Sequence, residues 1–314
     1  MRNNVIMTAL ALAMASTVAQ AANISSTAAG GLWSAGTTWQ GGVVPGETVA
    51  VTDVARIVNT SLVTLNYQPT YALGNVQIGR TTGGAGNLEV TTGGVLNMTL
   101  GSNMEVGSQT VGTLLLSGGT INVLSALNIS AQAATSSGSS VTVNSGNLNV
   151  GTVLAVGKFA SGSLMNNGGS IVAGNMNVGD AGNLTISTVS LTGGSLELTG
   201  LTGLSFNAVV GSKLSIANAA TLTLGGDKTT AIAGFVSGGN LFWATGSSPL
   251  GGLYGTGDQT FDNGFGSYLH SFYDGGAAKT YVWVDLVPVP EPATLSLAVL
   301  GGIGLWAGRR TRRS

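Results

Sequence analysis

The chain contains no cysteine, a single histidine and few charged residues. Without cysteine it forms no disulfide and offers no thiolate for catalysis or metal binding, so burial and backbone pairing must hold the fold. Charged residues are 7% of the 314 residues, against roughly 25% in an ordinary soluble domain. Hydrophobic residues still reach 43%, which excludes a disordered chain, because disorder requires few hydrophobic residues and a high net charge.

Basic residues are scarce outside the two ends of the sequence. Arg2 and four arginines between 309 and 313 lie in segments that we expect to be removed, for reasons given below. A formal charge of −6 then results from twelve acids and six basic residues, which are Arg56, Arg80, Lys158, Lys213, Lys228 and Lys279. A mildly acidic surface argues against nucleic acid as a partner.

The residue types used in catalysis are spread too thinly to predict a site. His270 is the one histidine, and the sequence has no Gly-x-Ser-x-Gly elbow. Asp258 and Asp262, with Asp274 nearby, could hold calcium or act as a glycosidase pair, but acids beside glycine are more often turn formers. We therefore predict no catalytic residue, no metal site, no cofactor and no enzymatic activity.

The first residues have the three parts of a secretory signal peptide. Arg2 supplies a positive start, and residues 5–15 are almost unbroken apolar sequence. Ala19 and Ala21 place small side chains at the two positions that a signal peptidase tests. We predict cleavage after Ala21, with Ala22 as the alternative. The protein would then depend on the secretion machinery and on signal peptidase.

A second three-part pattern closes the sequence. Pro290, Glu291 and Pro292 precede an uncharged run over residues 293–308, and four arginines follow it: Arg309, Arg310, Arg312 and Arg313. Proline favours an extended backbone, which is the form that a peptidase cleft grips. As a helix, the run would rise about 24 Å, slightly short of a ~30 Å hydrocarbon core. The arginines would keep that end on the cytoplasmic side.

This segment resembles the PEP-CTERM sorting signal of Gram-negative bacteria in its motif, span length, charge and position. The resemblance implies processing by an exosortase, a membrane-embedded, cysteine transpeptidase-like enzyme that removes the tail. Glu291 would be a recognition residue rather than a catalyst. The chain would be anchored transiently in the inner membrane and then reach the cell surface or the medium. An ordinary tail anchor is the alternative.

The middle of the sequence is a degenerate repeat without helical patterning. Apolar–glycine pairs recur at Ile78-Gly79, Val106-Gly107, Val156-Gly157 and Val178-Gly179. Between them, apolar positions 88, 114, 141, 164 and 184 are spaced by 26, 27, 23 and 20 residues. Short alternating strands at such a period indicate a solenoid, because a single coil cannot bury its apolar row alone. We predict an all-β parallel β-helix of six or seven coils, with a β-sandwich as the alternative.

The two flanks of the repeat have compositions of their own. Trp33 and Trp39 with glycine-rich turns indicate a cap over the core. This N-terminal segment resembles the openings of passenger-like β-repeat surface proteins. An irregular hairpin packed on the core fits the same residues equally well. The region 234–287 holds 11 of the 18 aromatic residues. We interpret it as a second cap, since a solenoid end exposes strand edges and core. A sugar-binding platform using Trp243 and Tyr254 is the alternative.

These observations divide the chain into five segments. They are a signal peptide (1–21), an N-terminal cap with the first strands (22–73), a β-helix (74–233), an aromatic-rich C-terminal cap (234–287) and a sorting signal with a transmembrane helix (288–314). We expect a structural or adhesive protein of the envelope or extracellular matrix that associates with polysaccharide. A carbohydrate-binding module and a β-helical polysaccharide-degrading enzyme remain alternatives. The enzyme is disfavoured because the remaining basic residues lie far apart in the sequence.

Overall fold

A computed structural model describes most of the chain between residues 22 and 286. The described ranges are 22–47, 53–80, 84–99, 101–179, 186–206, 211–217, 219–243, 259–262 and 267–286. The predicted signal peptide, transmembrane span and sorting signal lie outside these residues, as do Tyr254 and Asp258. Among the described residues, no helix has the length and apolar character needed to cross a membrane.

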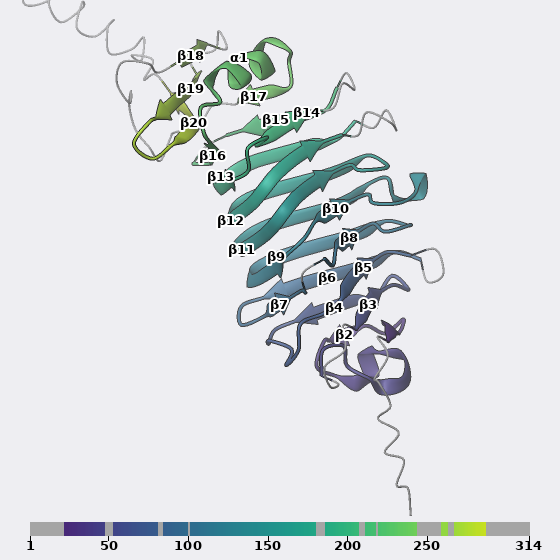
Figure 1. The fold of residues 1–314 in the computed structure, drawn as a ribbon. Helices are drawn as coiled ribbons and strands as arrows, with labels where there is room; N and C mark the ends of the chain where they lie inside the picture. The colour runs from purple at the N-terminus through teal and green to yellow at the C-terminus, as the bar shows by residue number, and fades with distance from the viewer. Residues whose placement is uncertain are drawn as a thin grey trace, which may run out of the picture.

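The described strands up to residue 243 stack in parallel into a solenoid of about seven turns (Figure 1). The prediction of an all-β solenoid is confirmed, and the β-sandwich alternative is wrong, because each strand pairs in parallel with the equivalent strand of the next coil. Alternating sequences such as Gly86–Thr91 bury every second residue, as a strand with one face on a core must. In the described part of the chain, the coils contribute to three stacks, called here sheets 1, 2 and 3.

Sheet 1 begins the coils and carries the polar row discussed below. It consists of β1 (Asn23–Ser25), β3 (Val54–Ile57), β5 (Asn75–Ile78), β8 (Met104–Val106), β10 (Leu127–Ile129), the last residues of β11 (Ser139–Val156) and β12 (Gly162–Val178), and β14 (Leu204–Phe206). Long strands such as β11 bend around the solenoid and therefore serve all three sheets.

Sheets 2 and 3 complete each coil. Sheet 2 contains β2 (Gly31–Leu32), β4 (Leu62–Leu65), β6 (Gly86–Thr91), the first residues of β9 (Gly112–Val123), β11, β12 and β13 (Thr188–Leu198), then β15 (Lys213–Ile216) and β17 (Leu241–Trp243). Sheet 3 contains β7 (Val95–Asn97), the later residues of β9, β11, β12 and β13, and β16 (Thr221–Gly225).

The inward positions of sheet 2 test the predicted repeat directly. Leu88, Leu114, Val141 and Leu164 are consecutive partners in the ladder, as the spacing predicted. The next partner is Val189, so the assignment of position 184 to this row was wrong. The last step is 25 residues instead of 20, because the chain between the two strands is longer than the glycine pattern suggested.

The two ends of the solenoid are closed differently. At the first coils, the buried rings of Trp33 and Trp39 meet edge to face at 4.8 Å beside the short helices η1 (Gly36–Thr38) and η2 (Gln40–Gly42). At the last coils, α1 (Thr229–Ser237) lies over the core, with Phe235 against Phe206. The sequence did not predict this helix, because nine residues are too few to show a helical period.

An antiparallel hairpin follows α1 and ends the parallel ladder (Figure 1). It is formed by β18 (Gln259–Asp262), β19 (Ser267–Asp274) and β20 (Lys279–Leu286), and β20 also pairs with the edge of β16. Thr280 connects the hairpin to the segment that follows β16. Its hydroxyl donates to the carbonyl of Gly226 and accepts from the Lys228 N–H, both at 2.8 Å. The hairpin thus covers an exposed strand edge, which is the role of a terminal cap.

Candidate functional site

The outward row of sheet 1 brings polar residues from successive coils into one line. The row runs Arg56, Gln77, Glu105, Asn128, Ala155, Asn177 and Ser205. Outward positions of a surface sheet are normally solvated, but Gln77, Glu105 and Asn128 are each at least nine-tenths buried. The segments that follow these strands shelter the row, as Gln132 does by contacting Glu105. Buried polar groups must be hydrogen-bonded within the protein, so the candidate binding positions are the partly exposed members of the row, such as Arg56 and Asn177.

Two arginines converge at one end of this row. Arg56 Nε and an Nη of Arg80 donate to the same acceptor, Gln77 Oε1, at 3.2 and 2.6 Å. Burial, and secondly the charge of Arg80, lower the pKa of Arg56, although a guanidinium remains charged at neutral pH. The amide oxygen of Gln77 therefore holds two positive groups side by side.

Glu105 lies on the other side of Gln77 and accepts three hydrogen bonds. The donors are Gln77 Nε2 at 3.1 Å, the Ser108 hydroxyl at 2.7 Å and Gln132 Nε2 at 2.6 Å. The side chain amide of Gln77 thus connects the arginine pair to a carboxylate, and the three charged groups carry a net charge of +1. Because its oxygens are engaged and only 9% of the residue is exposed, Glu105 is a poor general base.

A pocket of about 290 Å³ opens on the same sheet, one coil beyond Glu105. Asn128, Lys158 and Asn177 supply its polar lining. The amide oxygen of Asn177 accepts a hydrogen bond from the Ser205 hydroxyl at 2.6 Å. The arginine pair and the pocket therefore lie on the same face of sheet 1, displaced from each other along the solenoid axis.

The basic residues lie far apart in the sequence, but the inference that they also lie far apart in the fold is wrong for Arg56 and Arg80. They are 24 residues apart in sequence but bind one glutamine, because Arg56 is on β3 and Arg80 follows β5, the next strand of sheet 1. The signal was present in the sequence: aligning Ile57 with Ile78 places Arg56 on Gln77. The apolar–glycine pattern did not reveal this alignment, because Ile78 is followed by glycine whereas Ile57 is followed by valine. The coil that contains Ile57 was therefore not recognised as part of the repeat.

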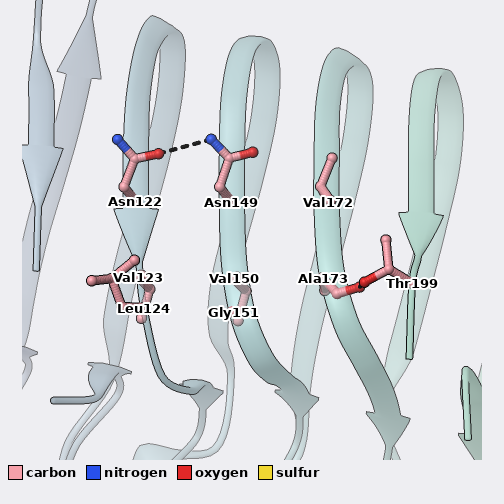
Figure 2. A pocket seen from close by; sticks show the side chains of 9 residues that line it. All are labelled: Asn122, Val123, Leu124, Asn149, Val150, Gly151, Val172, Ala173 and Thr199. Carbon is pink, nitrogen blue, oxygen red and sulfur yellow. Dashed lines mark hydrogen bonds between the residues drawn. The ribbon is translucent and has the colours of Figure 1, made fainter. Parts of the chain in front are cut away.

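Sheet 3 carries an uncharged pocket of about 280 Å³ beside an asparagine ladder. Asn122 donates to Asn97 Oδ1, and Asn149 donates to Asn122 Oδ1, each at 2.8 Å. Figure 2 shows the Asn122–Asn149 bond, with Val172 in the next coil and Leu124 among the residues of the pocket wall. The lining offers two amides, the hydroxyl of Thr199 and apolar surface, which are groups that can bind a neutral polar ligand.

The aromatic residue proposed for sugar contact, Trp243, lies at the end of sheet 2. It packs against the core, and its indole N–H donates to the carbonyl of Ser267 at 3.0 Å. The more exposed ring beside it is Phe242, over which Lys213 Nζ lies 4.8 Å from the ring centroid. Tyr254 is outside the described residues. Glycan binding by this pair stays a prediction.

His270 lies buried in the C-terminal hairpin. Its ring stacks on Trp283 at 5.0 Å, and Nε2 is 3.8 Å from Asp285 Oδ2. Asp274 accepts the N–H groups of Gly276 and Ala277, so it forms a turn. Asp262 is exposed on β18 and Asp258 is not described. Among the described residues, no three histidine or acidic side chains are placed to hold a metal ion.

Comparison with known proteins concerns the end of the sequence. Residues 288–313 match the family model of the PEP-CTERM protein-sorting motif, so the resemblance of this segment is confirmed. The match includes Pro290, Glu291, Pro292 and the four arginines. No curated protein and no solved structure matches the chain. The chain therefore carries a PEP-CTERM protein-sorting motif directly after its β-solenoid, which implies an exported protein that is sorted by an exosortase.

Proposed function

We propose that the protein is a non-enzymatic structural or adhesive component of the cell envelope or extracellular matrix that associates with polysaccharide. The sorting motif supports the location, because exosortase sorting implies export. The solenoid supports the mechanical role, since the stacked coils share one continuous hydrophobic core. Signal peptidase would cleave after Ala21, and the tail would hold the chain in the inner membrane until processing.

The observation that carries the association with polysaccharide is the pairing within the asparagine ladders. Each amide in the middle of a ladder, such as that of Asn122, spends one N–H and one lone pair on its neighbours along the axis. The second N–H and the second lone pair remain for solvent or ligand. Neighbouring strands are about 4.8 Å apart, so the face offers a regular array of donors and acceptors. A hydrated polymer of hydroxyl groups complements such an array.

The geometry of Glu105 supports a binding role over a polysaccharide-degrading one. The arginine pair and Glu105 do place acid and bases on one sheet, as such an enzyme requires. A catalytic base must however accept a substrate proton, and three protein donors already engage this carboxylate. This face of sheet 1 is therefore better suited to holding a polymer than to cleaving it.

Intact-mass analysis of the protein from envelope and medium fractions tests the sorting part. We expect a product that ends near Pro292. Replacing Glu291 by glutamine should leave the tail attached, whereas the matched control Glu89→Gln, on the outside of sheet 2, should be processed normally. A full-length C terminus of the wild-type chain in every fraction would show an ordinary anchor instead.

Co-fractionation tests the association itself. The protein should pellet with the extracellular polysaccharide of the producing cells and be released when the polymer is digested. Release into the soluble fraction without digestion, with the tail correctly processed, would contradict the association while leaving the sorting intact.

A further inference from the structure

We propose that Arg56 and Arg80 bind the carboxylate of an acidic polysaccharide, which lies along the outer face of sheet 1. The inference rests on the proposed association with polysaccharide and specifies its substrate class: a polymer that contains uronic acid or an equivalent carboxylate. Three features of this face carry it, namely the charge of the arginine pair, the donors that the pair leaves unused and the polar row that continues beyond it.

The arginine pair is a concentration of positive charge in a chain that is otherwise acidic. Both guanidiniums contact Gln77 Oε1, and within the described residues neither lies in an ion pair with an acid. Lys279, by contrast, has Glu197 at 2.7 Å. Two like charges on one neutral acceptor repel each other, and this repulsion adds to burial, the larger cause, in lowering the pKa of Arg56. An anion between them would remove that repulsion.

The unused donors favour a planar anion. Arg80 Nε is buried and has no hydrogen-bond partner in the described part of the chain. A buried donor without a partner is costly, so a rotation of this guanidinium that brings Nε onto a ligand oxygen would be favourable. The fork of a guanidinium matches the two oxygens of a carboxylate, a geometry that a lysine ammonium cannot provide. Arg56 and Arg80 are partly exposed, so a ligand can reach them.

The rest of the row favours a polymer over a small acid. Register places Asn177 five strands beyond Arg56 in sheet 1, a distance of roughly 24 Å at about 4.8 Å per strand. The 290 Å³ pocket lined by Asn128, Lys158 and Asn177 lies within that length. An extended chain with its carboxylate on the arginines would place its next units over these polar groups. Glu105 keeps its negative charge under its three neutral hydrogen bonds, but the two arginines outweigh it and leave the cluster a net charge of +1.

Equilibrium binding to two polymers that differ only in charge tests the inference. The probes are polygalacturonate and its fully methyl-esterified form, with protein recovered from the envelope of producing cells. We expect the wild type to bind the acid form at least about tenfold more tightly, since one charged hydrogen bond contributes about that much. The variant with Arg56→Gln and Arg80→Gln should lose the preference. The matched control Lys213→Gln removes one charge from sheet 2 and should keep it.

Three results would overturn the inference: equal affinity for the acid and ester forms, an unchanged preference in the double variant, or no binding of either polymer. Co-fractionation with the native polysaccharide tests the association separately. Equal affinity for the acid and ester forms would therefore contradict only the proposed carboxylate contact. If the double variant does not fold, Arg80→Lys serves instead, because it keeps the charge and removes the Nε donor. Its affinity for polygalacturonate should fall severalfold, and wild-type affinity would contradict the proposed contact.

Discussion

Ser130 occupies, one coil later, the corner position that Gly107 occupies at the end of β8. The residues before them, Val106 and Ile129, are partners in the ladder of sheet 1. Both corner residues have a left-handed backbone, with φ of 74° at Gly107 and 56° at Ser130. A Cβ at Gly107 would clash with the Ser139 side chain, lying 2.6 Å from its Cβ and closer still to its Oγ. At Ser130 the hydroxyl is accommodated and donates toward the carbonyls of Ser136 and Ser161.

This difference predicts an order of stability among variants of Ser130. Alanine keeps the unfavourable φ and loses the hydroxyl, so the free energy of unfolding should fall by about 1–3 kcal/mol. Glycine also loses the hydroxyl but relieves a left-handed strain of about 1–2 kcal/mol, and should lie close to the wild type. Chemical denaturation of the three proteins measures the order. Equal stability of the alanine and glycine variants would show that the backbone is not strained here.

The same position explains a gap in what the sequence predicts. The apolar–glycine pairs identified the corners after Ile78, Val106, Val156 and Val178, and each takes part in the stack of sheet 1. The corner after Ile129 was missed, because serine stands where the pattern has glycine. Hydrophobic alternation thus predicted the coil, but a corner whose strain is offset by hydrogen bonds shows no such pattern.

The candidate site was harder to predict than the fold for a related reason. Burial of apolar rows leaves a periodic pattern in one sequence, whereas the contact between Arg56 and Arg80 depends on which coil follows which. An error of one coil in aligning the strands would separate these two arginines in the predicted fold. Loop segments add partners such as Gln132, which reaches Glu105 from outside any strand. The candidate site could therefore be predicted only once the register of the strands was known, and the structure supplied that register.

Asn166 is a second departure from the pattern, and it yields a prediction. It occupies an inward position of sheet 2 between Val143 and Leu191 and is fully buried. Its amide donates to the carbonyls of Gly169 and Ser195, both at 3.1 Å, and its oxygen accepts the N–H groups of Gly168 and Gly169. All four hydrogen-bonding positions of the side chain are satisfied.

Replacing Asn166 by aspartate should therefore be severely destabilising. The carboxylate still accepts the two N–H groups but faces two carbonyls to which it cannot donate, at a cost of about 3 kcal/mol or more. Asn167→Asp is the matched control, since Asn167 is exposed and bonds to Asn144 at 2.8 Å, where water can substitute. Thermal unfolding of both variants decides. Similar losses at the two positions would contradict the role given to the buried amide.

The N-terminal tryptophan pair predicts a polarised loss of stability. Trp33 is buried and donates through its indole N–H to the carbonyl of Pro45 at 3.1 Å. Trp33→Ala should lower the free energy of unfolding by about 3–5 kcal/mol. Because coils in a solenoid contact only their neighbours, hydrogen exchange should accelerate in β1 to β4 and remain slow in β12 and β13. Uniform acceleration over all coils would show instead that the solenoid opens as one unit.

The bond between Lys279 and Glu197 ties the C-terminal hairpin to β13 across the edge of sheet 3. Lys279 Nζ donates to Glu197 Oε1 at 2.7 Å, and the side chains are 39% and 33% exposed. Hydrogen bonding to Glu197, and secondly its charge, raise the pKa of Lys279. A cation whose folded-state pKa is raised stabilises the fold fully below its unfolded-state pKa, about 10.4, and loses this contribution as the pH rises through the folded-state value.

Glu197→Gln should therefore lower stability only modestly and in a pH-dependent way. At pH 7 and low salt the loss should be about 0.2–1 kcal/mol, because exposed ion pairs are screened by water and salt. The difference should persist up to the unfolded-state pKa of about 10.4 and shrink as the pH rises through the raised folded-state pKa, since neutral lysine has no charge to lose. Denaturation midpoints at pH 7, 9 and 11, with Glu89→Gln as the control, measure this. A difference that stays constant to pH 11 would mean that Glu197 acts through packing and not through its charge.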